Sequence, residues 1–566
     1  MNTETSSIIA MFVMTLLLAL PLGRYIAKVY NGERTLLDPV FNSLERFFFK
    51  YSGINPHEEW SWQKNLVALL SINLIWFLLG MFIFMNMSWL PLNPDHNPSQ
   101  SPHLAFNTTI SFLVNCNLQH YSGESGVSYL GQLYLMFLQF TTAATGMAAA
   151  VILFRALRKG THKTTGNFFN DYLKSCTRIL LPICLVIGVL LMLNGTPMTL
   201  DGKQQMISVQ GDTTEISTGP VAAFVPIKHL GTNGGGFYGA NSAHPLENPT
   251  YLTNMTEMIA QMLLPFAMLF AFGYFIGRRR MAWVIFGVMT VGFLALAIPN
   301  IVMESGGNPE ITKMGIDNSL GNMEGKEVRI GAAASGYWSV ATTVISTGSV
   351  NSMHDSTMPL SGMNEMLAMM INCFYGGVGV GILNYFIFII LAVFISGLMV
   401  GRTPEFLGKK VEAREMKIAM IIALLHPFLI LTGTALAAYI HVHDPQAYSA
   451  WLNNPGFHGF SEMLYEYTSS AANNGSGFEG LGDNTPWWNI STGFVLILGR
   501  FLPIIGPVAI AGILGNKKYI PESAGTLQTD TPTFGLMTLT VIAIVAALAF
   551  FPALTLGPIA EHFSLR

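Results

Sequence analysis

Charged residues are scarce in this chain. Asp, Glu, Lys and Arg make up 11% of its 566 residues, against about 25% in an ordinary soluble domain. Hydrophobic residues make up 51%, so a soluble protein of this size would have too little charge to cover its surface. The net charge of −3 also lacks the basic excess that nucleic-acid binding needs. The composition argues against a soluble enzyme and a nucleic-acid partner, and indicates a membrane protein.

Cysteine is equally scarce. The four cysteines, Cys116, Cys176, Cys184 and Cys373, lie in or beside apolar segments with no CxxC spacing. This pattern predicts neither a disulfide framework nor a zinc site. The pairs His354-Asp355 and His426-Pro427 lack the several converging ligands that a metal or general-base site requires, so we expect structural roles for them.

Long apolar runs are abundant. A bilayer core needs about 20 apolar residues in a helix, and ten segments approach or exceed this length. The first follows a polar start without the basic region of a cleavable signal, so we expect it to remain as a span. The predicted spans are Ser7–Ala27, Lys64–Met85, Leu130–Arg155, Arg178–Leu193, Thr256–Ile276, Trp283–Met303, Ile371–Val400, Lys417–Ile440, Ile490–Leu514 and Phe534–Pro552.

Basic residues gather in the loops on one side of these spans. Because Lys and Arg are retained on the cytoplasmic side, we assign that side to the cytoplasm. The opposite loops Asn86–Tyr129 and His441–Asn489 contain no Lys or Arg. With an even number of spans, both termini are predicted to be extracytoplasmic. The basic residues in the loops assigned to the cytoplasm are Arg24, Lys28, Arg34, Arg46 and Lys50; Arg155, Arg158, Lys159, Lys163 and Lys174; Arg278, Arg279 and Arg280; Arg402, Lys409, Lys410 and Arg414; Lys517 and Lys518.

Four external links each contain a short apolar piece followed by Asn, Gly and Ser. They are Leu104–Gly123, Val221–Gly239, Tyr337–Ser352 and His458–Gly477. An apolar piece of this length is too short to span and is typical of a re-entrant helix. Exposed backbone at that depth is tolerated only where it lines water or protein, so the returning chain is predicted to line a pore.

The four turning points recur at similar intervals. Asn117, Gly234, Gly348 and Gly475 are spaced 117, 114 and 127 residues apart, which indicates an internal repeat of span, re-entrant helix, extended loop and span. The predicted fold is an all-α polytopic membrane protein whose four fused repeats form a pseudo-tetrameric, channel-like pore. Its single membrane domain (1–566) comprises a first span and cytoplasmic loop (1–60), repeats at 61–160, 175–280, 281–402 and 415–516, and a last span (530–566).

The chemistry of these turning points suits a dehydrated cation. A ring of four backbone segments can replace the water around potassium with carbonyl oxygens, and glycine lets the backbone turn them inward. The C-terminal ends of the re-entrant helices favour a cation at the same axis. Candidate filter residues are Asn115, Asn117, Gln119, Thr232, Asn233, Gly234, Gly235, Ser346, Thr347, Gly348, Asn473, Asn474 and Gly475.

Acidic residues in the external loops predict a negative funnel that concentrates cations, although each of them alone is equally typical of a solvated surface. They are Asp95, Glu124, Asp212, Glu215, Glu247, Asp355, Glu462, Glu466, Glu479 and Asp483.

Longer motifs carry a family resemblance. Leu230–Phe237 followed by Ala240–Pro245, Gly401–Glu405 with Leu407–Lys410, and Ser470–Ser476 resemble KdpA, the family of potassium-binding subunits of bacterial Kdp potassium-transporting ATPases. The resemblance runs essentially from end to end. It implies the architecture of the superfamily of potassium transporters, and a potassium-selecting role for Asn117, Gly234, Gly348 and Gly475, with Gln119 beside them.

The resemblance also implies a heteromeric pump in the bacterial plasma (inner) membrane. There a P-type ATPase subunit (KdpB) would hydrolyse ATP, with KdpC and a small single-span KdpF alongside, and membrane lipid around them. The chain has no Asp-Lys-Thr-Gly phosphorylation sequence and no GxxxxGK[ST] motif, so it is predicted to be non-catalytic by itself. No cofactor is expected, and potassium is the one metal ion expected.

Two features lie outside the predicted filter. The seventh span, Ile371–Val400, carries Gly376, Gly377 and Gly379, which would loosen or break its helix, and the resemblance implies that this break blocks simple flow to the cytoplasm. Close packing of small residues between helices is the alternative.

Arg500 places a permanent charge inside an apolar span. Such a charge normally faces a cavity or a partner. The resemblance implies a position near the route by which potassium leaves this subunit, and a structural pairing with a carboxylate is the alternative. The family often has an acidic residue where this chain has Asn372 and Tyr375, which counts against such a pairing.

The predicted function is therefore potassium binding and translocation within a high-affinity ATP-driven uptake complex. Potassium would be selected at the external filter and delivered to the ATPase partner. The alternative is a freestanding potassium channel or sodium-coupled potassium symporter of the same superfamily. A polytopic membrane enzyme is a more distant alternative because no catalytic cluster converges.

Overall fold

The computed structural model describes residues 3–401, 403–446, 448–521 and 527–565, so Arg402 of the predicted basic loop lies outside the described residues. Within these ranges, ten helical segments are long and apolar enough to cross a membrane, and the predicted all-α polytopic fold is confirmed. The spans are α1 (Thr3–Asn31), α3 (Trp62–Phe84), α6 (Tyr129–Ala156), α7 (Phe168–Lys174) continued by η1 (Ser175–Leu180) and α8 (Leu181–Leu193), α10 (Tyr251–Ile276), α11 (Arg279–Gly306), α15 (Val380–Val400), α16 (Ala413–His443), α18 (Pro486–Asn516), and α19 (Pro532–Leu554) continued by η5 (Thr555–Ile559) and α20 (Ala560–Ser564).

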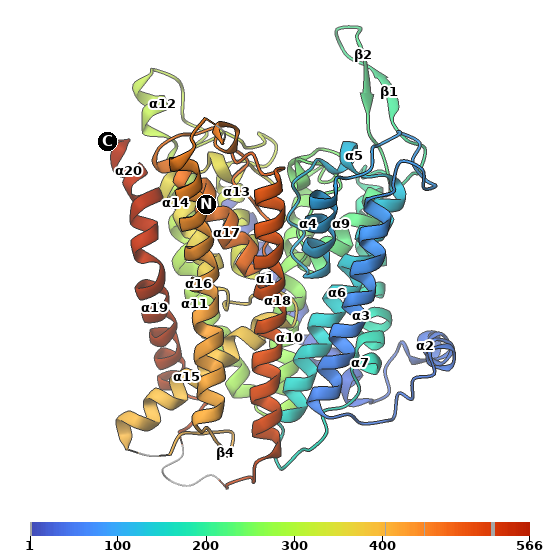
Figure 1. Cartoon of the computed structure of the whole chain (residues 1–566), viewed down its shortest axis with the longest axis vertical. Helices are drawn as coiled ribbons and strands as arrows, with labels where there is room; N and C mark the ends of the chain where they lie inside the picture. Colours follow the sequence, from blue (N-terminus) through green and yellow to red (C-terminus); the bar gives the residue numbers. More distant parts are fainter. Residues whose placement is uncertain (1–2, 402, 447, 522–526, 566) are drawn as a thin grey trace.

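Four shorter helices enter the bundle from one side without crossing it. They are α4 (Pro102–Leu113), α9 (Val221–Leu230), α13 (Ala332–Ile345) and α17 (Phe457–Ala472), and each is followed by non-helical chain. All four lie in the upper half of Figure 1. Each overlaps one of the four segments predicted to hold a re-entrant helix, and α13 begins five residues before the predicted segment.

The remaining elements cap the two ends of the bundle. Figure 1 shows both termini and the hairpin of β1 and β2 at the upper end, with α2 and β4 at the lower end. This is the arrangement that an even number of spans requires. The smaller elements are α2 (Asp38–Ser52), α5 (Gly123–Gly126), β1 (Gln204–Ile207), β2 (Thr213–Ile216), η2 (Asn241–Ala243), α12 (Pro309–Lys313), η3 (His354–Ser356), β3 (Glu405–Phe406), β4 (Lys409–Lys410) and η4 (Ser449–Trp451); β1 pairs with β2 and β3 with β4, both antiparallel.

The helix of the predicted seventh span, Ile371–Val400, is broken at its glycine run. The structure has α14 (Pro359–Ile371), a non-helical segment 372–379, and then α15. Gly376, Gly377 and Gly379 have φ values of +41°, +76° and +83°. A right-handed helix cannot accommodate such values, so the glycine run breaks the helix, and the chain enters this span at Pro359.

The fourth span begins ten residues earlier than Arg178, where it was predicted. The Asn167 side chain caps α7 by accepting hydrogen bonds from the N–H groups of Phe169 and Asn170. Asp171 is buried in an ion pair with Arg155. This ion pair allows a charged residue to lie inside the bundle. A prediction from hydropathy alone therefore placed the start of the fourth span too late.

Candidate functional site: a ring of four return loops

The chain after each re-entrant helix adopts the same backbone conformation. We call residues 115–119, 232–236, 346–350 and 473–477 the four return loops. In each loop the first and third residues have left-handed backbones: φ is +64° and +61° at Asn115 and Asn117, +50° and +94° at Thr232 and Gly234, +55° and +82° at Ser346 and Gly348, and +51° and +107° at Asn473 and Gly475. Left-handed residues other than glycine are uncommon, so this fourfold coincidence identifies the loops as structural repeats.

A backbone hydrogen bond recurs in the same way. The N–H of the second residue of each loop donates to the carbonyl oxygen five residues earlier, inside the preceding re-entrant helix. The donor–acceptor pairs are Cys116–Ser111 (3.0 Å), Asn233–Lys228 (2.8 Å), Thr347–Thr342 (2.9 Å) and Asn474–Ser469 (2.9 Å).

The third residue of each loop faces the next loop, which closes the ring. A Cβ on Gly234 would lie 1.8 Å from the Thr347 carbonyl oxygen, one on Gly348 would lie 2.2 Å from that of Asn474, and one on Gly475 would lie 2.1 Å from that of Cys116. These distances are too short for any side chain, so glycine is required at all three positions.

The first loop carries Asn117 where the others have glycine. Its Cβ faces the second loop at Gly235, since a Cβ on that glycine would lie 2.7 Å from it. Gly235 therefore provides the space that Asn117 fills. Both polar atoms of the Asn117 side chain are buried without a hydrogen-bond partner in the described structure, and an unpaired buried amide is costly unless an ion or water satisfies it.

Side chains also join neighbouring loops. The Asn115 amide donates to the carbonyl oxygens of Gly231 (3.0 Å) and Thr232 (3.2 Å). The Gln119 amide donates to the Gly236 carbonyl (3.0 Å) and accepts from the Gly236 N–H (2.8 Å). The Asn474 amide donates to the carbonyl oxygen of Thr342 (2.9 Å), at the end of the third re-entrant helix. All thirteen candidate filter residues lie in these four loops.

The broken seventh span packs directly against the ring. The Val378 N–H donates to the Thr232 hydroxyl (2.9 Å), and a Cβ on Gly377 would lie 3.4 Å from the carbonyl oxygen of Ile345, the last residue of α13. The Asn372 side chain accepts from the Ser346 hydroxyl (2.8 Å). Segment 372–379 thus touches the second and third loops at once.

Arg500 lies near the same segment. It is buried, its Nη2 has no hydrogen-bond partner, and no ion pair to it is found within the described ranges. A Cβ on Gly146 of α6 would lie 3.2 Å from this Nη2 and 2.7 Å from the Val378 carbonyl oxygen. The alternative, in which Arg500 pairs with a carboxylate, is therefore not supported. Arg500 and segment 372–379 both lie next to Gly146.

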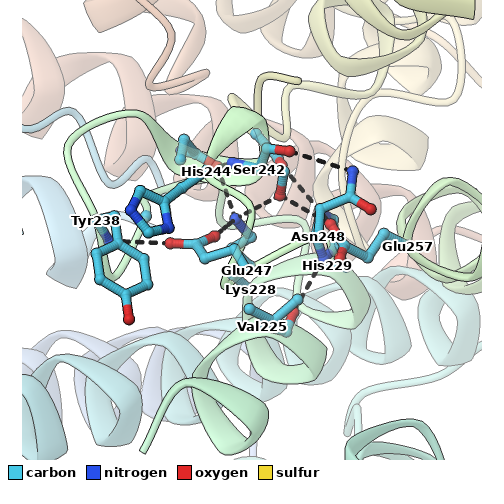
Figure 2. Close-up of polar contacts among 12 residues, drawn as sticks. Val225, Lys228, His229, Tyr238, Ser242, His244, Glu247, Asn248 and Glu257 are labelled. Carbon is cyan, nitrogen blue, oxygen red and sulfur yellow. Dashed lines mark hydrogen bonds and ion pairs between the residues drawn. The ribbon is translucent and has the colours of Figure 1, made fainter. Parts of the chain in front are cut away.

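Sequence reasoning missed a buried ion pair behind the second loop (Figure 2). Lys228 of α9 and Glu247 are fully buried and form a close ion pair. The Lys228 ammonium also donates to Asn241 Oδ1 (2.6 Å) and Ser242 Oγ (2.8 Å), and the Asn241 amide donates to the Gly234 carbonyl (2.8 Å). In the sequence, the signal that could have indicated this ion pair was Lys228, a charged residue in the short apolar helix α9.

His229 joins the second and third repeats. It contacts the Val225 carbonyl oxygen through Nδ1 (3.0 Å; Figure 2). Its Nε2 contacts the Ser349 hydroxyl (2.9 Å). Because a carbonyl oxygen only accepts, Nδ1 carries the proton and Nε2 accepts from Ser349. The Glu257 side chain in turn accepts from the Ser242 hydroxyl (2.8 Å).

A second buried charge lies behind the first and fourth loops. His120 contacts Glu466 through Nε2 (3.1 Å) and Asn489 Oδ1 through Nδ1 (2.8 Å). Burial favours the neutral imidazole, but the negative charge of Asp483 and the hydrogen bond with Glu466 raise the pKa of His120 to about 9. Of the ten acidic residues expected to form a funnel, Glu247 and Glu466 are buried and paired, Glu247 with Lys228 and Glu466 with His120.

Comparison with known proteins decides the family. A family model described as the potassium-transporting ATPase A subunit, KdpA, matches residues 9–563. The chain belongs to the KdpA family. Among its relatives are the potassium-transporting ATPase potassium-binding subunits of Flavobacterium johnsoniae (66% identical) and Phocaeicola vulgatus (62%), each covering 100% of both chains, and of Geobacillus kaustophilus (45%, covering 98% of both).

The chain shares its fold with a more distant solved structure. The potassium transporter TrkH from Vibrio parahaemolyticus is similar with a TM-score of 0.50 and 15% sequence identity, covering 89% of this chain and 98% of that one. At this identity the likeness supports the shared fold alone.

Proposed function

We propose that this chain is the potassium-binding subunit of an ATP-driven potassium uptake complex. It selects external K⁺ at the ring of return loops and delivers the ion to a P-type ATPase subunit. The observation that carries this proposal is the fourfold left-handed backbone repeat that closes into a ring within a KdpA-family chain.

The ring has the chemistry that K⁺ requires. Carbonyl oxygens of Cys116, Thr347 and Asn474 lie where adjacent loops meet, and oxygen atoms can replace the hydration shell of the ion. The re-entrant helices end at the ring, so their partly negative C-terminal ends favour a cation there. The unpaired buried amide of Asn117 offers one further oxygen.

The ion's exit is the second part of the proposal. Segment 372–379 packs against the ring and obstructs a direct path to the cytoplasm, with Gly376, Gly377 and Gly379 as its flexible positions. Arg500, a buried cation beside it, repels K⁺ from that direction. A cavity of about 60 Å³ beside Asn372, bordered by Asn384 and His426, supports a sideways route.

Energy for uptake comes from a partner. Relatives of this chain are named as subunits of a potassium-transporting ATPase, which supports a non-catalytic role beside a KdpB-like ATPase with KdpC-like and KdpF-like subunits. We place the complex in the bacterial plasma (inner) membrane with both termini outside, because the basic loops lie at the opposite end.

Reconstitution of the complex in liposomes tests this function. We expect K⁺-stimulated ATP hydrolysis, and a Gly234→Asp change should weaken apparent K⁺ affinity at least tenfold because Thr347 leaves no room for a side chain. Gly287→Ala is the matched control, since no atom lies within 4 Å of its added Cβ. Robust K⁺ flux by this chain alone, or unchanged affinity in Gly234→Asp, would contradict the proposal.

A further inference from the structure

A second polar cluster lies outside the ring, at the end of the bundle that holds the termini. Asp355, His458 and Glu462 each present a ligand atom, and the three atoms lie within 4.8 Å of one another. Asp355 follows the third return loop, whereas His458 and Glu462 belong to α17, the fourth re-entrant helix. The cluster therefore connects two repeats.

The backbone leaves room for this cluster at Gly480. A Cβ there would lie 2.3 Å from Glu462 Oε1 and 2.7 Å from Asp355 Oδ2, so any side chain would enter the space between the two carboxylates. The Gly480 N–H also donates to Asp355 Oδ2 (3.1 Å). The Asn454 amide donates to Glu462 Oε1 (3.0 Å).

Two observations indicate that the cluster takes a cation. Glu462 is fully buried, and its Oε2 has no hydrogen-bond partner in the described structure. A buried carboxylate oxygen is costly to leave unpaired. In addition, His458 is held by a carboxylate on its other side, since its Nδ1 lies 2.8 Å from Glu561 Oε1 of α20, and its ring stacks on Phe478.

The contact between His458 Nδ1 and Glu561 resembles the hydrogen bonds that surround the ligands of metal sites. A metal-ligating histidine usually donates its other N–H to a carboxylate, which fixes the ring and its tautomer. Here Nδ1–H donates to Glu561, while Nε2 faces Asp355 Oδ1 at 2.8 Å. A divalent ion that binds Nε2 would replace the proton now shared with Asp355.

We propose that Asp355, His458 and Glu462 bind a divalent transition-metal ion of the Zn²⁺ class, with Glu561 as the positioning residue for His458. One nitrogen and two carboxylates are a donor set that Zn²⁺ accepts, and the imidazole disfavours Mg²⁺ and Ca²⁺. Ligand atoms around one such ion lie about 3–4 Å apart given bonds of about 2.0–2.2 Å, so shifts of less than about 1 Å would complete the site. The bound ion would clamp the chain after the third loop to α17 and, through Glu561, to the last helix.

Calorimetric titration of the chelator-treated, purified full-length chain with Zn²⁺ tests this site. We expect saturable binding of one ion per chain and a higher thermal unfolding midpoint with Zn²⁺. His458→Ala should weaken binding by at least 100-fold, and Glu561→Gln by about 10–100-fold. Glu462→Gln should weaken binding by at least tenfold while keeping the oxygen that accepts from Asn454, so it tests the site even if His458→Ala fails to fold.

His443→Ala is the matched control, because His443 is an exposed histidine at the same end of the bundle. Its affinity for Zn²⁺ should equal that of the unmodified chain. Absence of saturable Zn²⁺ binding, or equal affinity in Glu462→Gln and the unmodified chain, would overturn the proposal. The K⁺ affinity of the ring is a separate measurement, so failure of this site leaves the proposed transport function standing.

Discussion

Individual residues of the ring are constrained by their neighbours' carbonyl oxygens. Glycines in the fourth loop show this clearly, because two of them lie two positions apart in different surroundings. A Cβ on Gly475 would meet the Cys116 carbonyl oxygen at 2.1 Å, whereas one on Gly477 would meet no atom within 4 Å. The chemical identity of the residue is the same, and the spatial constraint differs.

Gly475→Ala should therefore impair K⁺ binding, while Gly477→Ala should not. The left-handed backbone at Gly475 costs an alanine about 1–3 kcal/mol, and the clash displaces the first loop. We expect a loss of at least tenfold in apparent K⁺ affinity, measured by K⁺-stimulated ATP hydrolysis of the complex. Equal affinities in the two variants would show that the ring does not set K⁺ binding.

The buried pair of Lys228 and Glu247 makes a prediction about stability. Removing one member of a buried pair leaves an uncompensated charge and costs about 3–5 kcal/mol. Lys228→Met should thus lower the thermal unfolding midpoint, and adding Glu247→Gln should restore part of the loss. The control is Lys313→Met, which removes a pair exposed by 61% and 35% and worth about 0–1 kcal/mol. If Lys228→Met lowered the thermal unfolding midpoint by less than Lys313→Met, the buried pair of Lys228 and Glu247 would not have the stabilising role assigned to it.

At the scale of elements, hydropathy and turn residues predicted where the re-entrant helices lie. Each combines a short apolar piece with Asn, Gly or Ser at the point of return, and both properties are local in sequence. The partner of Lys228 could not be predicted in this way, because pairing with Glu247 depends on how the chain folds back after the second loop. The start of the fourth span was missed for the same reason, since Asp171 is neutralised by Arg155 on another helix.

The broken seventh span is the element whose function is most directly testable. Gly377→Ala and Gly379→Ala place side chains at positions with φ of +76° and +83°, and the latter would approach the Gly146 carbonyl oxygen at 2.3 Å. We expect K⁺ uptake to change severalfold in these variants, while co-purification with the ATPase subunit stays unchanged. Gly287→Ala in α11 again serves as the control. Unchanged K⁺ uptake in both variants would contradict the proposed gating role of segment 372–379.

At the scale of the whole molecule, charge distribution predicted the orientation of the chain. The elements of the basic loops, α2 and β4, lie at the opposite end of the bundle from the hairpin of β1 and β2 (Figure 1). This separation can be tested with cysteine labelling. Val209, between β1 and β2, and Leu36, between α1 and α2, have exposed fractions of 107% and 92%. Three of the four native cysteines are buried, so the background is low.

In right-side-out vesicles, a membrane-impermeant maleimide should label Val209→Cys at once and Leu36→Cys only after permeabilisation. The unmodified chain controls for labelling of Cys176, the half-buried native cysteine. The opposite labelling pattern would invert the proposed orientation and place the ring on the cytoplasmic side.

Because the four repeats belong to one chain, their sequences need not be identical. In an assembly of four separate copies, a helix break such as 372–379 would occur four times around the axis or not at all. Here, within the described residues, the third repeat alone carries it, next to Arg500. A ring of four similar loops can therefore be contacted by a broken helix on one side only. In the proposed function, this asymmetry would give the departing ion a preferred direction that a symmetric channel lacks.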